Sequence, residues 1–184
     1  MLKIYITDLA AYNKGFLIGD WISLPISDDE LSEAINKIIR GGEAICAIEY
    51  AYEKHEEYFI TDWEWEEEIE LLDVEEYSNP YTLNKQLQLI EEHGAEDCLK
   101  ELSFLLSQGY ATDVNDALEK LDNVILHENQ SMTDVAYELI QECYNLDSIP
   151  SIVANYINYE AVARDLEIEG NYTVINADVI EYRD

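Results

Sequence analysis

Apolar residues alternate with polar ones in several short stretches of the first third of the chain. The stretches "LKIYIT" (2–7), "DWISLP" (20–25), "AICAIEYAY" (44–52) and "EYFITDWEW" (57–65) have the composition and spacing of β-strands. Between them, Ser27 and Glu30 form a capping-box pattern, apolar residues follow at helical spacing to Ile39, and Gly41-Gly42 comes next. The pattern predicts a small antiparallel sheet with one helix, ended by the two glycines, packed on it.

Helical spacing dominates the middle of the chain. Asn79-Pro80 predicts a helix start, and further helices are predicted around 99–106, from about 112, from about 131 and between 151 and 169. A strand is predicted at "NVILHEN" (123–129), and a hairpin at "NYTVINADVIEY" (171–182). This order favours an α+β fold. The predicted domains are 1–61 (antiparallel sheet plus helix), 62–109 (acidic segment and helical middle) and 110–184 (mixed α+β).

The charge balance determines which partners are plausible. The formal net charge is −31, although 48% of residues are hydrophobic, so we expect a folded and strongly acidic protein. Such a surface is repelled by nucleic acid and by anionic membranes and is attracted to basic proteins. Three cysteines without paired spacing, no signal-peptide pattern and no long apolar run lead us to expect a cytoplasmic protein.

Catalytic and metal-binding motifs are missing from the sequence. The histidines at 55, 93 and 127 are far apart and are expected to be exposed or at helix caps. "DVNDALEK", from Asp113, begins like a calcium loop but has Leu118 where that loop requires glycine. We therefore predict no catalytic residue, no metal ligand and no cofactor. A hydrolase using two carboxylates remains an alternative, because acid pairs are unavoidable in so acidic a chain.

The segment "TDWEWEEEIELLDVEEY" (61–77) combines carboxylates with two tryptophans and several aliphatic residues. If 62–70 is extended, Glu64, Glu66, Glu68 and Glu70 share one face at about 6.6 Å intervals, comparable with duplex phosphates at about 3.4 Å per strand. We interpret the apolar residues as anchors that fix the acids; the alternative is that the acids only confer solubility. The predicted partner-binding acidic face comprises Asp62, Glu64, Glu66, Glu67, Glu68, Glu70, Asp73, Glu75, Glu76, Glu91, Glu92, Glu96, Asp97, Asp113 and Asp116.

Three stretches, "IYITDLAAYNKGFLIGDWI" (4–22), "YFITDWE" (58–64) and "IPSIVANYINYEAVARDLEIEGNY" (149–172), together resemble the ArdA family of antirestriction proteins. The resemblance implies an elongated, acidic homodimer that mimics duplex DNA. Such a dimer occupies the DNA-binding groove of type I restriction-modification enzymes, formed by basic methyltransferase and specificity subunits. It also implies a gene carried on mobile genetic elements.

The family's antirestriction motif, close to the dimer contact, corresponds to residues 156–166. Its apolar side chains are expected either in a self-complementary dimer patch or in the core of one chain, and Arg164 is expected to pair with a carboxylate of either subunit. Asn158 stands where family members often have aspartate, and it still suits a helix N-cap. The predicted dimer and motif residues are Tyr156, Ile157, Asn158, Tyr159, Glu160, Val162, Arg164, Asp165 and Leu166.

The sequence thus predicts a non-enzymatic DNA-mimic inhibitor of type I restriction-modification enzymes that binds neither nucleic acid nor membranes itself. The alternative partner is another basic nucleic-acid-binding protein, such as a histone-like protein or a repressor.

Overall fold

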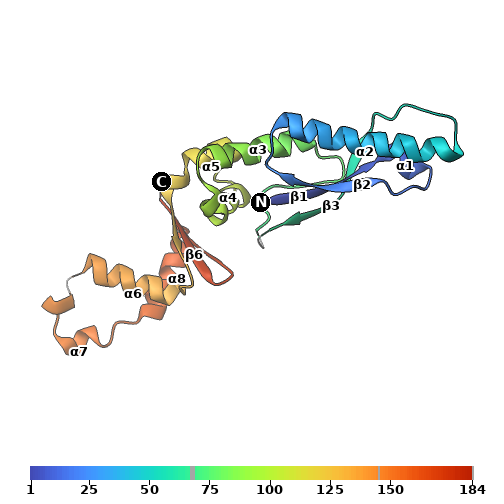
Figure 1. The fold of residues 1–184 in the computed structure, drawn as a ribbon. Helices are drawn as coiled ribbons and strands as arrows, with labels where there is room; N and C mark the ends of the chain where they lie inside the picture. The colour runs from blue at the N-terminus through green and yellow to red at the C-terminus, as the bar shows by residue number, and fades with distance from the viewer. Residues whose placement is uncertain (67–68, 145, 184) are drawn as a thin grey trace. The chain divides into compact units, whose positions relative to one another are not determined.

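A computed structural model describes residues 1–66, 69–144 and 146–183 (Figure 1). It contains α-helices and two separate three-stranded antiparallel sheets, which confirms the α+β prediction. The chain divides into two compact units, Met1–Leu118 and Glu119–Asp184. The division into three domains at residues 61 and 109 stays a prediction.

The sheet of the first unit has the order β2-β1-β3. Its strands are β1 (Leu2–Asp8), β2 (Gly19–Leu24) and β3 (Tyr58–Trp65). Leu2, Ile4 and Ile6 are completely buried on the face that helix α2 (Asp28–Glu49) covers (Figure 1). The β1–β3 register shifts between Tyr5 and Ile6, so Thr61 forms a bulge beside the start of the acidic segment.

Helix α2 corrects two predictions. It begins with the expected Ser27 capping box but continues through Gly41-Gly42 to Glu49, so "AICAIEYAY" is mostly helix rather than strand. The reason is tertiary: a Cβ atom at Gly42 would lie 2.0 Å from Asp8 Oδ2. Gly42 therefore lets the helix pass close to a buried carboxylate instead of ending the helix.

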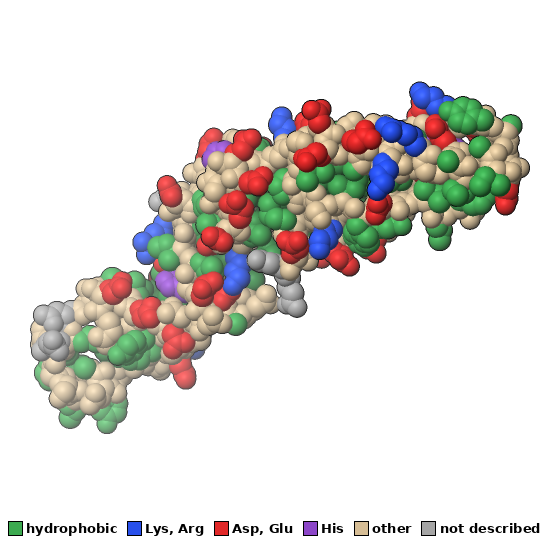
Figure 2. Space-filling model, in the orientation of Figure 1, with side chains coloured by type: hydrophobic (Ala, Val, Ile, Leu, Met, Phe, Trp, Pro, Cys, Tyr) green, Lys and Arg blue, Asp and Glu red, His purple; other side chains and the backbone are tan. Residues whose placement is uncertain are grey.

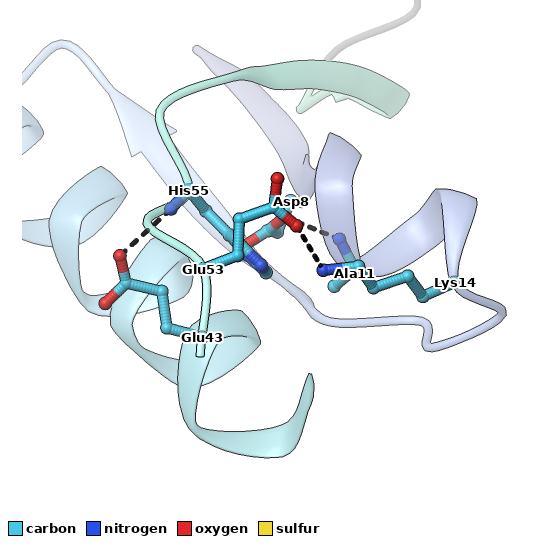
Figure 3. Close-up of polar contacts among 6 residues, drawn as sticks. All are labelled: Asp8, Ala11, Lys14, Glu43, Glu53 and His55. Carbon is cyan, nitrogen blue, oxygen red and sulfur yellow. Dashed lines mark hydrogen bonds and ion pairs between the residues drawn. The ribbon is translucent and has the colours of Figure 1, made fainter. Parts of the chain in front are cut away.

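Asp8 and His55 lie at the centre of this close approach (Figure 3). Both side chains are fully buried, and His55 Nδ1 lies 2.7 Å from Asp8 Oδ2. Asp8 Oδ1 also accepts a 2.8 Å hydrogen bond from the Ala11 amide and so caps a short helix, α1 (Leu9–Asn13), that sequence patterns did not predict. The expectation that His55 is exposed or caps a helix is wrong, because its ring joins β1 to the 50–57 loop.

The rest of the first unit is helical, as expected. Asn79 caps α3 and Pro80 occupies its first turn, while Leu83, Leu87 and Ile90 are buried along one side. The preceding 69–79 segment is attached to the fold by hydrogen bonds from Ile60 N to Glu76 O (2.8 Å) and from Ser103 Oγ to Glu70 O (3.2 Å). The helices are α3 (Pro80–Glu92), α4 (Leu99–Ser107) and α5 (Val114–Glu119), with a 3₁₀ turn, η1 (Glu96–Cys98), before α4.

The second unit has a sheet of order β4-β6-β5 and helices packed beside it. Its core contains Met132, Val135, Ala136, Ala163 and Val179. The predicted strand and hairpin are both present, and α8 ends at Gly170, which adopts the left-handed conformation. The elements are β4 (Val124–His127), α6 (Met132–Cys143), α7 (Ser151–Ala154), α8 (Tyr159–Glu169), β5 (Tyr172–Ile175) and β6 (Asp178–Tyr182), with 3₁₀ turns η2 (Leu121–Asn123) and η3 (Leu146–Ser148).

Within the described parts of both units, no helix combines the length and apolar character required to cross a membrane.

Candidate functional site

The acidic segment leaves the sheet earlier than an extended 62–70 stretch requires. Strand β3 ends at Trp65 and the chain bends at Glu66, so a continuous row from Glu64 to Glu70 on one strand is not formed. Asp62 and Glu64 do share a face of the sheet. They pair in register with Tyr5 and Lys3 of β1, whose side chains point to the same face. Glu67 and Glu68 of the predicted face lie outside the described residues.

Aliphatic side chains, more than tryptophans, attach the acidic segment 61–77 to the rest of the fold. Leu71 and Val74 retain only 5% and 8% exposure, as expected for residues that fix the neighbouring acids to the fold. Trp63, in contrast, keeps 39% of its surface exposed, so it does not serve as a buried anchor.

Three acids of the predicted face have partners within the chain. Glu66 accepts a 3.0 Å hydrogen bond from the Met1 ammonium group and lies 3.8 Å from Lys3 Nζ. The bond from Met1 is the main reason that the pKa of Glu66 is lowered. At α5, Asp113 Oδ1 accepts from the Asp116 amide (2.9 Å), and Asp116 Oδ2 accepts from the Thr112 amide (2.9 Å). These two acids therefore also stabilise a helix start.

Most of the other predicted acids have no such partner. Asp62 only accepts a local bond from the Trp63 amide at 2.9 Å. The remaining described members are exposed, and their side chains make no hydrogen bond or ion pair with any residue in 1–66, 69–144 or 146–183. They are Glu64, Glu70, Asp73, Glu75, Glu76, Glu91, Glu92, Glu96 and Asp97.

Basic side chains are mostly engaged with other acids. The pairs are Lys14–Glu53 (2.8 Å), Lys37–Asp20 (3.6 Å), Arg40–Glu33 (3.3 Å), Lys54–Glu56 (2.6 Å) and Arg183–Glu181 (2.6 Å). On the face in view, Figure 2 shows carboxylates spread over the first unit, with several basic groups among them. The predicted acidic face is therefore left with uncompensated negative charge.

Residues of the predicted motif in the second unit fall into two sets. Val162 and Leu166 pack against the core of their own chain, which corresponds to the alternative of intrachain packing. Asn158 caps α8 by accepting a 3.0 Å hydrogen bond from the Ala161 amide, as expected. The Tyr159 ring contacts Tyr137 edge-to-face at 5.1 Å.

The other set faces solvent. Tyr156 is 83% exposed, Ile157 is half-buried, and Glu160, Arg164 and Asp165 are exposed. Arg164 forms no ion pair with any residue in the described parts of the chain. The outward set is therefore available for a contact outside the second unit.

One protein family matches a stretch of the chain that includes both the acidic segment and the 156–166 motif. A family model described as "Antirestriction protein (ArdA)" matches residues 4–181. The chain belongs to the ArdA family of antirestriction proteins. ArdA membership implies a function against restriction-modification. Comparison with curated proteins gave no significant match.

The ArdA match spans the acidic segment and the 156–166 motif, but this chain also has a feature that the sequence-based prediction missed. The sheet face opposite α2 bears a shallow hollow of about 680 Å³ lined in part by Tyr5, Tyr12, Trp21 and Phe59. Strand alternation in "LKIYIT" already placed Tyr5 on the face opposite Ile4 and Ile6. Following that alternation would have identified an aromatic outer face.

Among the residues that the structure describes, no group of three or more His, Cys, Asp or Glu side chains is arranged to hold a metal ion. The buried Asp8–His55 pair is fully enclosed, so it serves the fold and has no surface on which to meet a substrate.

Proposed function

We propose that this protein is a DNA mimic that inhibits type I restriction-modification enzymes by occupying the DNA-binding groove of their methyltransferase and specificity subunits. The observation that carries the proposal is the set of exposed carboxylates that have no cationic partner in the described chain, on a folded framework. It acts by binding, without turnover, and reaches its target in the cytoplasm. Its gene is carried on mobile DNA that benefits from protection.

Fixed carboxylates suit a groove that binds phosphates. Asp62 and Glu64 are two strand residues apart, about 6.6 Å, which is close to twice the spacing of about 3.4 Å between phosphates along one DNA strand. A second group comprises Glu91 and Glu92 in the last turn of α3 and Glu96 and Asp97 in the 3₁₀ turn η1 that follows it. Because these acids are already held by helices and a strand, docking orders fewer side chains and loops than a disordered polyanion would require.

The active form in this proposal is a homodimer formed through the motif region. Ile152, Val153 and Tyr156 are 71%, 55% and 83% exposed, an unusual concentration of apolar surface in so acidic a chain. Arg164 is available to pair with a carboxylate of the second subunit, since it has no partner among the described residues of its own chain.

The test is neutralisation of the second acidic group without change of shape. The combined variant Glu91→Gln, Glu92→Gln, Glu96→Gln, Asp97→Asn should weaken inhibition of a type I enzyme's DNA binding at least about tenfold, because several charge contacts are lost together. The matched control keeps every charge: Glu91→Asp, Glu92→Asp, Glu96→Asp, Asp97→Glu should inhibit within about threefold of the native chain.

Three results would contradict the proposal. Equal inhibition by both variants and the native chain would show that these acids do not contact the groove. If a single neutralised carboxylate abolished function in a folded protein, a catalytic acid would explain the result better than distributed mimicry. Weak inhibition combined with tight binding to a histone-like protein or a repressor would instead favour another basic partner.

A further inference from the structure

The hollow on the open face of the first sheet is built from two aromatic pairs. Tyr5 and Trp21 lie edge-to-face with ring centroids 5.3 Å apart, and Tyr12 and Phe59 do the same at 5.2 Å. Trp21 and Tyr12 keep 40% and 47% of their surfaces exposed. Among the described residues of the first unit, the long helix α2 covers the opposite face of the sheet (Figure 1).

Carboxylates stand beside these rings. Asp62 and Glu76 both line the hollow, and no lysine or arginine is among its lining residues. The Asp62 side chain faces the same side of the sheet as Tyr5, its partner in the strand register. Lys3 also points to this side but lies 3.8 Å from Glu66. The hollow therefore combines π faces with net negative charge.

We propose that this hollow is a binding site for an arginine side chain presented by the basic partner. A guanidinium group is planar and weakly hydrated, so it stacks on aromatic rings while its N–H groups donate to carboxylates. Lysine fits less well, because its compact ammonium group is more strongly hydrated and makes no planar stack. The site adds specificity for arginine to a surface that otherwise attracts any cation.

The proposed function supplies only the identity of the partner that carries this arginine. Charge excludes another aromatic-stacking ligand, the base of a nucleotide or nucleic acid, because the attached phosphates would face Asp62, Glu76 and an overall charge of −31. A second copy of this chain is disfavoured for the same reason, since the same two acids would be brought toward an acidic surface.

The test uses three short peptides that differ only at the central residue of Ac-Gly-X-Gly-NH₂, where X is arginine, lysine or citrulline. Citrulline keeps the shape of arginine and removes its charge. In ¹H–¹⁵N NMR spectra of the full chain, the Trp21 indole signal should shift saturably as the arginine peptide is added. The lysine peptide should bind with an affinity at least about threefold weaker, and the citrulline peptide should leave the signal unchanged.

Variants locate the site. Trp21→Leu and Asp62→Asn should each weaken arginine-peptide binding about three- to tenfold. Asp73→Asn changes the net charge equally at an exposed acid outside the hollow, and it should leave the affinity within about twofold. Dispersed spectra show that each variant is folded, and for Trp21→Leu the amide signals of Tyr5 and Asp62 replace the lost indole signal.

The outcomes separate this site from the proposed function. If the arginine peptide binds here but the chain does not inhibit a type I enzyme, the hollow stands and the proposed function fails. If the chain inhibits the enzyme but all three peptides leave the Trp21 signal unchanged, or shift signals over the whole surface equally, the arginine site is overturned. Signals of this face that shift with protein concentration alone would show that a second copy covers it, which also overturns the site.

Discussion

Replacement of Gly42 by alanine tests the closest contact in the first unit. The added Cβ would lie 2.0 Å from Asp8 Oδ2 and 2.6 Å from Asp8 Cγ. Asp8 cannot move freely, because its buried carboxylate is held by His55 Nδ1 at 2.7 Å and the Ala11 amide at 2.8 Å. Either these bonds are lost or α2 moves away from the sheet.

The magnitude follows from these two costs. Loss of hydrogen bonds to a buried polar group costs about 1–3 kcal/mol, and overpacking a buried site costs about 1–3 kcal/mol. The better helix propensity of alanine returns about 1 kcal/mol. The two costs together, less this gain, mean that Gly42→Ala should lower the free energy of unfolding by about 1–5 kcal/mol.

Urea unfolding followed by tryptophan fluorescence measures this effect, because Trp21, Trp63 and Trp65 all lie in the first unit. Gly41→Ala is the matched control, since its Cβ would meet only Ile18 Cγ2 at 3.6 Å. That variant should be as stable as the native chain or up to about 1 kcal/mol more stable. Equal stability of the two variants would refute the close approach of α2 to Asp8.

Three further predictions concern the second unit. Burial acts to raise the pKa of Glu181, but the hydrogen bonds from Arg183, together with His127 Nε2 at 3.5 Å, outweigh it and leave the pKa lowered. A lowered carboxyl pKa stabilises the fold above its unfolded value of about 4.3, and this contribution is lost as pH falls through the folded pKa. Glu181→Gln should thus lower the Tm at pH 7, and the difference from the native chain should shrink as the pH falls through the folded pKa; a difference independent of pH would contradict this. Ser131→Ala removes the capping box of α6 and should cost about 1 kcal/mol in urea unfolding followed by circular dichroism, whereas an unchanged midpoint would count against the cap. Tyr156→Ser should shift sedimentation toward the monomer while Val174→Ser, at a separate exposed apolar position, should not; equal behaviour would remove Tyr156 from the dimer contact.

Local signals predicted most elements of this fold correctly. The Ser27 capping box and the Asn79-Pro80 start depend on neighbours in sequence, and both are present. Gly41-Gly42 misled the prediction because its cause, the carboxylate of Asp8, lies more than thirty positions away in the chain. A glycine pair inside a helical pattern has the same appearance whether it ends the helix or makes room for another residue.

The acidic surface was predictable in composition but not in detail. Sequence alone indicated exposed carboxylates, and the described members are exposed or, for Asp116, half-buried. It did not show that Glu66 is held by the Met1 ammonium group, since that contact depends on how the strands pair across the sheet. The aromatic hollow was missed because its residues come from separate strands and from α1.

The central claim is that carboxylates fixed on a folded framework compete with DNA for the basic groove of a type I enzyme. The most direct measurement is fluorescence anisotropy of a labelled target duplex bound to a purified type I methyltransferase, titrated with this protein at several salt and DNA concentrations. The account predicts displacement at near-stoichiometric amounts, an apparent inhibition constant that rises in proportion to DNA concentration, and an affinity that falls steeply with salt. Displacement only at large excess, or independent of DNA concentration and salt, would contradict it.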